Sequence, residues 1–493
     1  MTTEIVTFED TTQDQPNPQS GDSSVDITTV NDYQFIEEAF KGTGGFKDGT
    51  YLKNHHREMF YDIRRSQAHY ANYVRPVVTA MYKAVFSEKI TREVSNERYE
   101  LFIKDCTSHG VDLTSFVKMC VKYVRLHGMV AIVVDNKKQD EALLKEDAIK
   151  RKLNPYCYIK KANEFNTDGI TFDSFGNLET IMYFDHSKVE KANGENTLVN
   201  YYRYWDSEKS ILYKEEKVET DDPTFEEKYT PIDEKTNALG KLPVYIMYEE
   251  ALNDPTELYA DTPRYQLAKI NATIFNQDSE GREVERNQGF GILTIPEDGN
   301  GSEEKDKTLG TGNYLGYPVD SRNSPEMINV EPDLILALSE KRAKSMESLI
   351  EIAEQSGVQG ITKSQDAKSG LAYAFEFFAY EATLKESSRI AAKIEKEIRN
   401  LFNDWTRENV EYDIDYPTNF KPNKTQEKYT QLTETMESPG ITKQFKDKCE
   451  IEKYQLMFPE DEEGLEILKR QQMEVEPEFN SDQNIEDDNE SES

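Results

Sequence analysis

The residues of this chain that could carry chemistry are few and scattered. Asp413 and Asp415 lie two residues apart in VEYDIDYPTNF, which is expected to form a strand pair, so both carboxylates would share one face of a strand, as in nucleases that use a divalent ion. No third acid or basic residue stands at a suitable spacing, and a pair of exposed strand acids is the plainer interpretation. His55 and His56 are adjacent in an expected helix. They point to different faces and therefore cannot chelate one metal ion together.

Motifs of the large enzyme classes are absent from the sequence. It contains no Gly-x-Ser-x-Gly, no His-Glu-x-x-His and no Walker motif. The glycine-rich GTGNYLG at 310–316 lacks both the Walker spacing and its Gly-Lys-Ser/Thr ending. Four cysteines, at 106, 120, 157 and 449, form no CxxC pair and are expected to be reduced. The sequence therefore predicts no catalytic residue, no metal ligand and no cofactor.

Charge and composition limit the partners of the chain. Its 493 residues, enough for two to four domains, hold 59 basic and 94 acidic residues, a formal net charge of -35. Such a balance argues against tight wrapping of nucleic acid, because affinity for phosphate grows with Lys and Arg contacts. An acidic surface would still let a duplex pass without adhering, although solubility alone is the plainer explanation. No window approaches the roughly 18 apolar residues of a membrane-spanning helix, and no secretory signal is visible.

Both ends of the chain are expected to be disordered acidic tails. Residues 1–30 contain no Lys or Arg and have no apolar periodicity, and residues 474–493 hold nine acids and no base. Between the tails, residues 31–127 read mainly as helices, with SFVKMCVKYVRLHG ending at Gly128. GMVAIVVDN at 128–136 is an apolar β-branched run typical of a buried strand, and alternating segments up to 250 indicate antiparallel hairpins. We expect a helix-rich α+β fold.

The stretch from Thr262 to Trp405 is the most informative part of the chain. It reads as a helix, a glycine-rich β insertion from Gly289 to about Val330, a second helix after Pro332, a polar glycine loop and one long helix. In the first helix, apolar and small residues recur at i+3/i+4 steps as a narrow stripe with a charged remainder, namely Tyr265, Ala268, Ala272, Phe275 and Ser279. The second helix has a broader apolar face, made of Leu334, Leu338, Ala343, Met346, Leu349, Ile350 and Ala353. Two long helices that flank a β module suit a mechanical part better than a catalytic domain.

This order of elements resembles the portal protein of tailed bacteriophages, the head-to-tail connector subunit. The matching segments are VRLHGMVAIVVDN at 124–136, NALGKLPVYIMY at 237–248, the helix–insertion–helix segment, and the turn Ser438-Pro439-Gly440 followed by Ile441-Thr442. The resemblance covers roughly residues 31–470. It implies a portal fold with wing, stem, clip and crown regions. It places the tails at 1–30 and 473–493, and the regions between them as follows: wing 31–255, stem helix 256–288, clip 289–331, second stem helix 332–356, tunnel loop 357–370, spine helix and wing 371–424, and crown helices 425–472.

The resemblance also implies a function, partners and contact residues. The chain would be a structural subunit, not an enzyme, of a ring of twelve copies around a channel for double-stranded DNA at one capsid vertex. Its partners would be further copies of itself, capsid or scaffolding proteins, the terminase during packaging and later a tail or neck adaptor. It would be found in the virion, and in the host cytoplasm during assembly. The expected DNA-channel residues are Gln359, Thr362, Lys363, Gln365 and Lys368, and the expected clip contacts are Glu303, Glu304, Lys305, Asp306 and Lys307.

Two other classes of function remain open from the sequence. One is a metal-dependent DNA-processing enzyme that would use Asp413 and Asp415. The other is an acidic adaptor or binding module with disordered tails. The mass of the purified particle separates them, because a ring indicates a portal and a single chain that cleaves DNA with a metal ion indicates an enzyme.

Overall fold

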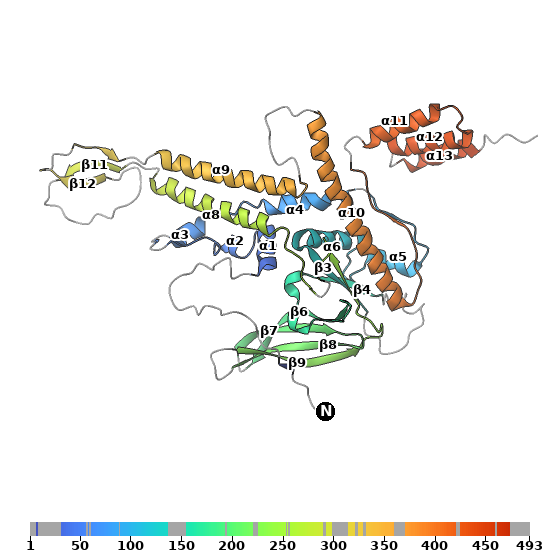
Figure 1. Ribbon diagram of the computed structural model, residues 1–493, viewed down its shortest axis with the longest axis horizontal. Helices are drawn as coiled ribbons and strands as arrows, with labels where there is room; N and C mark the ends of the chain where they lie inside the picture. Colours follow the sequence, from blue (N-terminus) through green and yellow to red (C-terminus); the bar gives the residue numbers. More distant parts are fainter. Residues whose placement is uncertain are drawn as a thin grey trace, which may run out of the picture. The chain divides into compact units, whose positions relative to one another are not determined.

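The chain folds as two units that are described separately, residues 1–418 and 419–493. The computed structural model (Figure 1) describes residues 6–7, 31–55, 58, 61–87, 89–136, 154–192, 195–219, 225–252, 254, 257–288, 292–297, 314–320, 324–328, 332–358, 370–420, 424–458 and 461–473. The expected class is confirmed, since the fold is helix-rich and of the α+β type. No helix in these ranges is long and apolar enough to cross a bilayer.

The first unit opens with short helices whose ends are fixed by local chemistry. The helices are α1 (Asp32–Lys41), α2 (Gly45–Asp48), α3 (Tyr61–Gln67), α4 (Val74–Lys83) with the 3-10 turn η2 (Ala84–Phe86), α5 (Glu97–Lys104) and α6 (Leu113–His127). Asn31, Asn96 and Asp112 cap α1, α5 and α6 by accepting backbone N–H hydrogen bonds. Gly128 ends α6 in the left-handed region at φ 80°. A side chain there would place its Cβ 2.6 Å from the Asp261 carbonyl oxygen, so only glycine fits.

A three-stranded antiparallel sheet forms the centre of the first unit. Its order is β10-β3-β4, from β10 (Val244–Tyr248), β3 (Met129–Asp135) and β4 (Tyr156–Lys160). Six of the seven β3 residues are buried, as expected for the apolar run GMVAIVVDN. The 37-residue helix α10 (Gly370–Thr406) packs against α6, α4 and β3. Trp405 at its end donates a hydrogen bond to the Val134 carbonyl oxygen at 2.6 Å.

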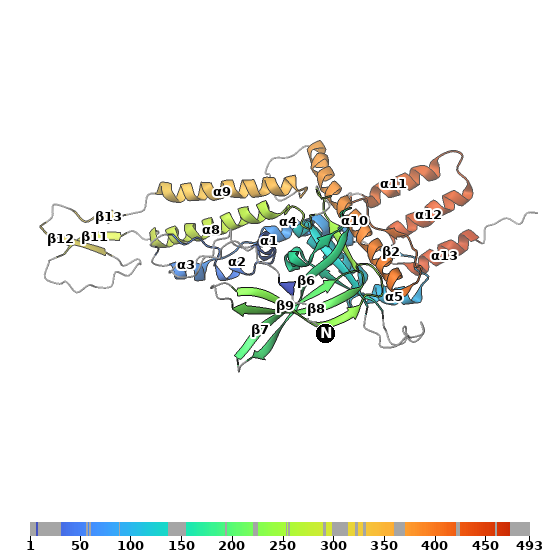
Figure 2. The same cartoon turned by 60° about the horizontal axis from the view of Figure 1, so that its bottom comes forward.

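A second, larger sheet belongs to the same unit (Figure 2). Its order is β1-β9-β8-β7-β6-β5, from β1 (Val6–Thr7), β9 (Phe225–Thr236), β8 (Lys209–Glu219), β7 (Glu195–Trp205), β6 (Leu178–Ala192) and β5 (Thr171–Phe172). All its neighbours run antiparallel, which confirms the hairpins expected from the alternating sequence. Tyr183 and Trp205 are buried and join this sheet to Val133 of the central sheet.

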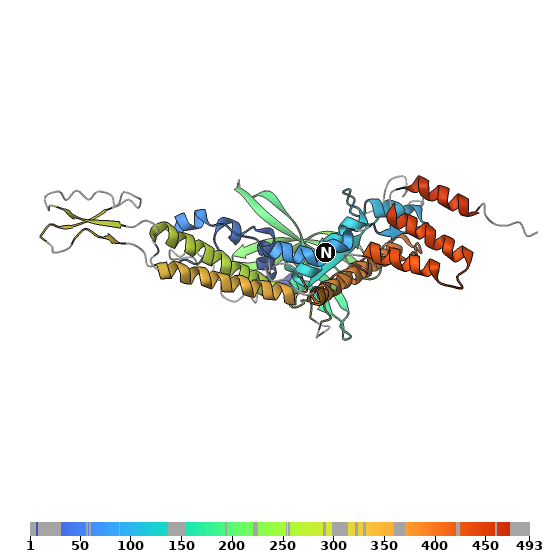
Figure 3. The ribbon, with the colours of Figure 1, turned by 90° about the horizontal axis from the view of Figure 1, so that it is seen from above.

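Two 24-residue helices and a small sheet make up the segment that the sequence singles out. They are α8 (Tyr265–Gln288), α9 (Pro332–Gln355) and the strands β11 (Ile292–Glu297), β12 (Tyr314–Pro318) and β13 (Met327–Ile328). The two helices lie side by side, and the strands of the small sheet fall between them in the sequence (Figure 3). β11 pairs in parallel with β12 and antiparallel with β13.

The described residues of the second unit form three helices. They are α11 (Lys424–Glu437), α12 (Lys443–Met457) and α13 (Glu462–Met473). α12 packs on both α11 and α13. The turn at Ser438-Pro439-Gly440 and the start near Thr442 agree with the sequence analysis, whereas α13 is a helix that it does not name.

Three expectations about local structure are wrong. The long amphipathic helix expected after Asn54 is not formed: α3 has seven residues, and His55 lies outside any helix. After α3, the Ala71 carbonyl oxygen and the Tyr73 N–H form hydrogen bonds with the Asn271 side chain of α8 instead of within a helix. The strand pair expected in VEYDIDYPTNF is a single short strand, β14 (Ile414–Asp415), which pairs with the distant β2 (Thr91–Arg92). The buried face of α8 is also much wider than a stripe, as described below.

A buried ion pair explains why β14 lies where it does. Glu395 of α10 is fully buried and receives two hydrogen bonds from the Arg92 guanidinium, at 2.5 and 2.7 Å. The hydroxyls of Tyr412 and Tyr416 donate to the same carboxylate at 2.9 and 2.6 Å. Both carboxylate oxygens are therefore saturated, which a buried charge requires. The network ties α10 to the strands β2 and β14.

Replacing this glutamate should unfold the first unit more readily. Glu395→Ala leaves the Arg92 charge buried and unpaired, so we expect a loss of about 3–5 kcal/mol in the free energy of unfolding. Urea denaturation followed by circular dichroism measures the loss. The neighbouring exposed Lys396→Ala serves as the control and should change stability by less than about 0.5 kcal/mol. Equal midpoints for the two variants would contradict the role of the network.

Candidate functional site

The ten contact residues expected from the sequence lie outside the described residues. Residues 303–307 fall in the span between β11 and β12, and residues 359, 362, 363, 365 and 368 fall between Val358 and Gly370. Their roles therefore stay predictions. The described neighbours of these segments, namely the α8–α9 pair and the start of α10, form the candidate functional region.

The first half of α8 is buried on more than one side. Leu267, Ile274 and Phe275 are each about 1% exposed, although only Phe275 belongs to the expected stripe. The ring of Phe275 packs edge-on to Phe46 and Tyr70, with centroids 5.8 and 5.7 Å apart. The extra burial arises because α8 contacts α1, α3 and α4 as well as α9. α8 is therefore a core helix at its start, not a surface helix.

Two asparagines on α8 fix it to the N-terminal segments. Asn271 accepts hydrogen bonds from the Tyr70 hydroxyl and the Tyr73 backbone N–H, each at 2.9 Å, and donates to the Ala71 carbonyl oxygen. Asn276 accepts from the Lys53 backbone N–H at 2.8 Å and donates to the Tyr51 carbonyl oxygen. Their amides satisfy backbone groups that have no helix or strand to join. The sequence analysis did not predict a role for either asparagine. The only signal for one was the presence of two amide side chains on an otherwise apolar face of the helix.

The base of α8 is held by a buried cluster of charges. Glu249, which follows β10, accepts hydrogen bonds on one oxygen from Arg125 at 2.5 Å and from Arg264 at 2.8 Å. Arg125 also donates to the Ser387 hydroxyl and the Thr383 carbonyl oxygen of α10. Arg264 immediately precedes α8, so a single carboxylate connects α6, α8 and α10. Burial lowers the pKa of Arg264 despite the attraction of Glu249.

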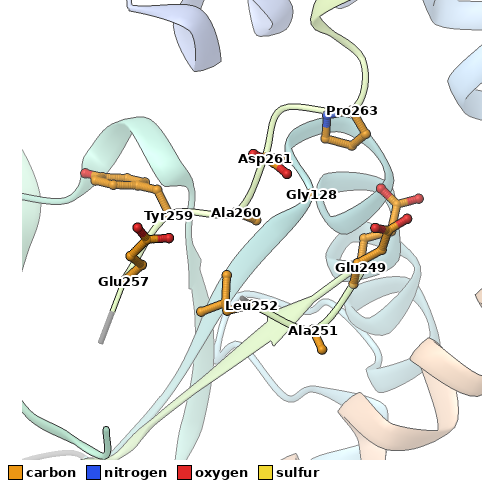
Figure 4. Close-up of a pocket in the computed structure, with 10 residues that line it drawn as sticks. Gly128, Glu249, Ala251, Leu252, Glu257, Tyr259, Ala260, Asp261 and Pro263 are labelled. Carbon is orange, nitrogen blue, oxygen red and sulfur yellow. The ribbon is translucent and has the colours of Figure 1, made fainter. Parts of the chain in front are cut away.

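A small cavity lies beside this cluster (Figure 4). Its volume is about 140 Å³, and carboxylates of Glu249, Glu250, Glu257 and Asp261 are among its lining groups. Within the described ranges no group of three or more His, Cys, Asp or Glu side chains is arranged to hold a metal ion.

Asp413 and Asp415 are both exposed and alternate with the buried Tyr412 and Tyr416, so they belong to the outer face of that segment.

The outer half of the helix pair is joined more loosely. The Arg342 guanidinium of α9 forms an ion pair with Asp278 of α8. A cavity of about 320 Å³ separates the helices around Gly281, with Leu338 on the opposite side. Asp278 therefore forms an ion pair within the chain.

α9 is covered on one side only. Leu349 and Ala353 are buried on the side that faces α8, but Leu336, on the other side of the helix, is 59% exposed. Ala343, expected on the apolar face, is one helical repeat of seven residues further on and is exposed as well. α8 is the main neighbour of α9 among the described elements. Nothing within the described chain buries Leu336 and Ala343, which gives α9 an apolar surface of the kind that a partner covers.

Comparisons with solved structures give likenesses to this chain, whereas comparisons of its sequence give none. No family model matches the chain, and no curated protein matches it. A chain of the solved structure described as "Virion of native gene transfer agent (GTA) particle" is similar, at a TM-score of 0.41 and 11% sequence identity. The likeness covers 84% of this chain and 91% of that chain. A likeness of this size assigns no function to the chain.

His127, next to Gly128 at the end of α6, makes the base of α8 sensitive to acid. Its ring is fully buried against Tyr33 and Tyr123, and neither ring nitrogen has a hydrogen-bond partner among the described residues. Burial lowers its pKa from 6.5 to about 4, against the opposing pull of Glu37. The unfolded chain therefore binds a proton near pH 6.5 that the folded chain refuses until about pH 4.

Stability should consequently fall as the pH drops. The contribution of His127 is fully present above about pH 6.5 and decreases below it, by about 2 kcal/mol between roughly pH 7 and pH 5. His127→Phe keeps the aromatic contacts and should remove that part of the pH dependence in urea denaturation. The exposed His109→Phe should behave like the unchanged chain. A His127→Phe variant with the original pH dependence would refute this assignment.

Gly281 offers a direct test of the space between α8 and α9. A Cβ at this helical position meets no atom within 4 Å, so Gly281→Ala should stabilise the chain by about 0.5–1 kcal/mol through the helix backbone. The matched control is Gly357→Ala. There φ is +79° and the Cβ would lie 2.0 Å from the Thr383 hydroxyl oxygen, so the same change should destabilise. Thermal unfolding at equal chain concentration measures both, and a destabilised Gly281→Ala variant would show that the space is filled.

Proposed function

We propose that this chain is the structural subunit of a ring-shaped phage portal that forms the DNA channel at one capsid vertex. The observation that carries the proposal is the one-sided burial of α9, whose Leu336 and Ala343 stay exposed on the side away from α8, while α8 itself is fixed firmly in the core. A second copy placed against α9 buries these side chains, and repetition around an axis closes a ring. The order of the elements supports the same proposal. A helix, a β module, a second helix and a long helix follow one another, and the sequence resembles that of phage portal proteins in this order.

Each region then has a proposed role. Residues 31–255 and 371–424 form the wing, 256–288 and 332–356 the stem, 289–331 the clip, 357–370 the tunnel loop and 425–472 the crown. The clip, with residues 303–307, meets the terminase during packaging and a tail or neck adaptor afterwards. The polar loop side chains, including Lys363 and Lys368, contact the passing duplex. Because the terminase supplies the energy, the subunit itself acts by position and has no catalytic step.

The acidic character of the chain fits a channel through which DNA passes. A formal charge of -35 repels phosphate, so DNA that slides through an acidic channel does not bind there for long. Any contact with the duplex would then depend on the few lysines of the tunnel loop. This differs from a DNA-binding protein, which gathers positive charge along its contact surface.

The decisive experiment is the size of the purified particle and its dependence on α9. The unchanged chain should form rings of about twelve copies, with a mass about twelve times 57.0 kDa, in mass photometry and negative-stain electron micrographs. Leu336→Glu combined with Ala343→Glu places two charges in the proposed interface. We expect at least a tenfold fall in the assembled fraction, since the burial of Leu336 alone contributes about 1.5–3 kcal/mol.

The control is Phe175→Glu, which changes an exposed side chain in the turn between β5 and β6. It should leave the rings intact, and all variants should keep the same circular dichroism spectrum. An unchanged chain that stays single at high concentration would refute the ring. Metal-stimulated cleavage of DNA by that single chain would support the enzyme alternative, and binding of one partner without a ring would support the adaptor alternative.

A further inference from the structure

Three of the four cysteines lie together inside the first unit. Cys106 follows α5, Cys120 lies on α6 and Cys157 lies on β4, and each is at most 1% exposed. All three are free thiols in this structure. Cys157 is within electrostatic reach of both other thiols, so cysteines from three separate elements share one buried site. Neighbouring thiols of this kind can be joined by oxidation, and the geometry decides which two.

The backbone holds Cys106 and Cys157 side by side. The Cys157 N–H donates a hydrogen bond to the Cys106 carbonyl oxygen at 2.7 Å. A backbone hydrogen bond of this kind sets the two Cα atoms roughly 5–6 Å apart, within the range of about 4.4–6.8 Å that a disulfide requires. The two thiols are also hydrogen-bonded to each other, so the side chains point toward one another. Both the backbone separation and the side-chain direction therefore suit a disulfide.

Cys120 is the less suitable partner for either of these cysteines. It lies in the middle of α6, where its backbone N–H and C=O groups serve the helix itself. Its interaction with Cys106 is electrostatic. A bond to Cys120 would have to move a helix that packs against α4, α10 and β3. The fourth cysteine, Cys449, belongs to α12 of the second unit.

The turn after Cys106 provides a route to its sulfur. Residues 108–110 are exposed, and Ser108 has a φ of 63°, a left-handed conformation that is unfavourable for serine. Across this turn the Cys106 backbone N–H and thiol both donate to the Val111 carbonyl oxygen, at 2.9 and 3.5 Å. Opening of the turn breaks these two hydrogen bonds and admits a reagent to Cys106. Cys157 stays enclosed on β4, and burial raises the pKa of its thiol well above the ordinary value. Cys106 is therefore the thiol that reacts first.

We propose that Cys106 and Cys157 form a modification site, at which a small organic disulfide converts the two thiols into an intramolecular disulfide. In the first step the Cys106 sulfur bonds to one sulfur of the oxidant, and the released thiol takes the Cys106 proton. In the second step the Cys157 sulfur displaces the thiol that remains attached, which takes the Cys157 proton. Two protein thiols are oxidised, and one oxidant molecule is reduced to two thiols.

The bond would cross-link the connection between α5 and α6 to β4 of the central sheet. It closes a loop of about 50 residues, and a cross-link of this length restricts the unfolded chain far more than the folded one. The structure shows the reduced form, and an oxidising medium would convert it into a form that unfolds less readily. The proposal concerns a single chain and is independent of the ring proposed above.

Oxidised glutathione tests the proposal on the folded, full-length chain. After incubation the intact mass should fall by the mass of two hydrogen atoms, with no glutathione attached. A non-reducing peptide map should then join the Cys106 peptide to the Cys157 peptide. Cys157→Ala should instead retain one glutathione on Cys106, because no second thiol displaces it. Cys120→Ala and Cys449→Ala are the matched controls, and both should still form the bond.

Urea denaturation of the oxidised chain measures the effect of the cross-link. The equilibrium constant for unfolding of the first unit should fall roughly a hundredfold, and dithiothreitol should restore the value of the reduced chain. Four reduced thiols after exposure to the oxidant would overturn the proposal. A mapped bond to Cys120, or a glutathione that stays on Cys106 of the unchanged chain, would overturn it as well. Equal unfolding of the oxidised and reduced chains would refute the stabilising role of the bond.

Discussion

The structure depends on how the start of α8 is fixed in the core. Arg125 and Arg264 share the single carboxylate of Glu249, and that sharing joins α6, α10 and the base of α8. Removing two guanidinium groups from water is costly, so the site holds only because carbonyl and hydroxyl oxygens satisfy Arg125 further. Asn271 and Asn276 extend the attachment along the next three turns of α8. Everything that lies beyond, namely the outer half of α8, the helix α9 and the β module between them in sequence, is positioned by this attachment.

Much of the architecture can be read from apolar patterns. The run 129–134 predicts a buried strand, the glycine at 128 predicts the end of α6, and the recurrence of Ile394, Ile398 and Phe402 predicts a helix buried along one side. These predictions succeed because the period of burial is local to each element. The helix, β module and helix that carry the functional proposal were visible for the same reason.

The predictions that failed concern places where contacts between distant residues decide the local structure. Nothing near Glu395 in the sequence indicates that Arg92, Tyr412 and Tyr416 will meet its carboxylate, although that meeting reduces the expected strand pair to one short strand. Likewise, Asn271 draws residues 71–73 out of an expected helix, and its partners are some 200 positions away. The width of the buried face of α8 follows from three helices packing on it, which no periodicity within α8 reveals. The ten residues expected to touch DNA or the packaging motor stay predictions, because they lie outside the described ranges.

The one-sided burial of α9 places two separate demands on a single helix. Residues such as Leu349 and Ala353, which face α8, are constrained by the folding of the individual chain. Residues on the opposite side can change without cost to that folding, so selection acts on them only through whatever they touch outside the chain. Among diverging relatives the two sides should therefore evolve at different rates, and the outer one should vary in step with its counterpart surface. The substitutions along this one helix would then reflect two separate constraints, the folding of the chain on one side and its assembly with a partner on the other.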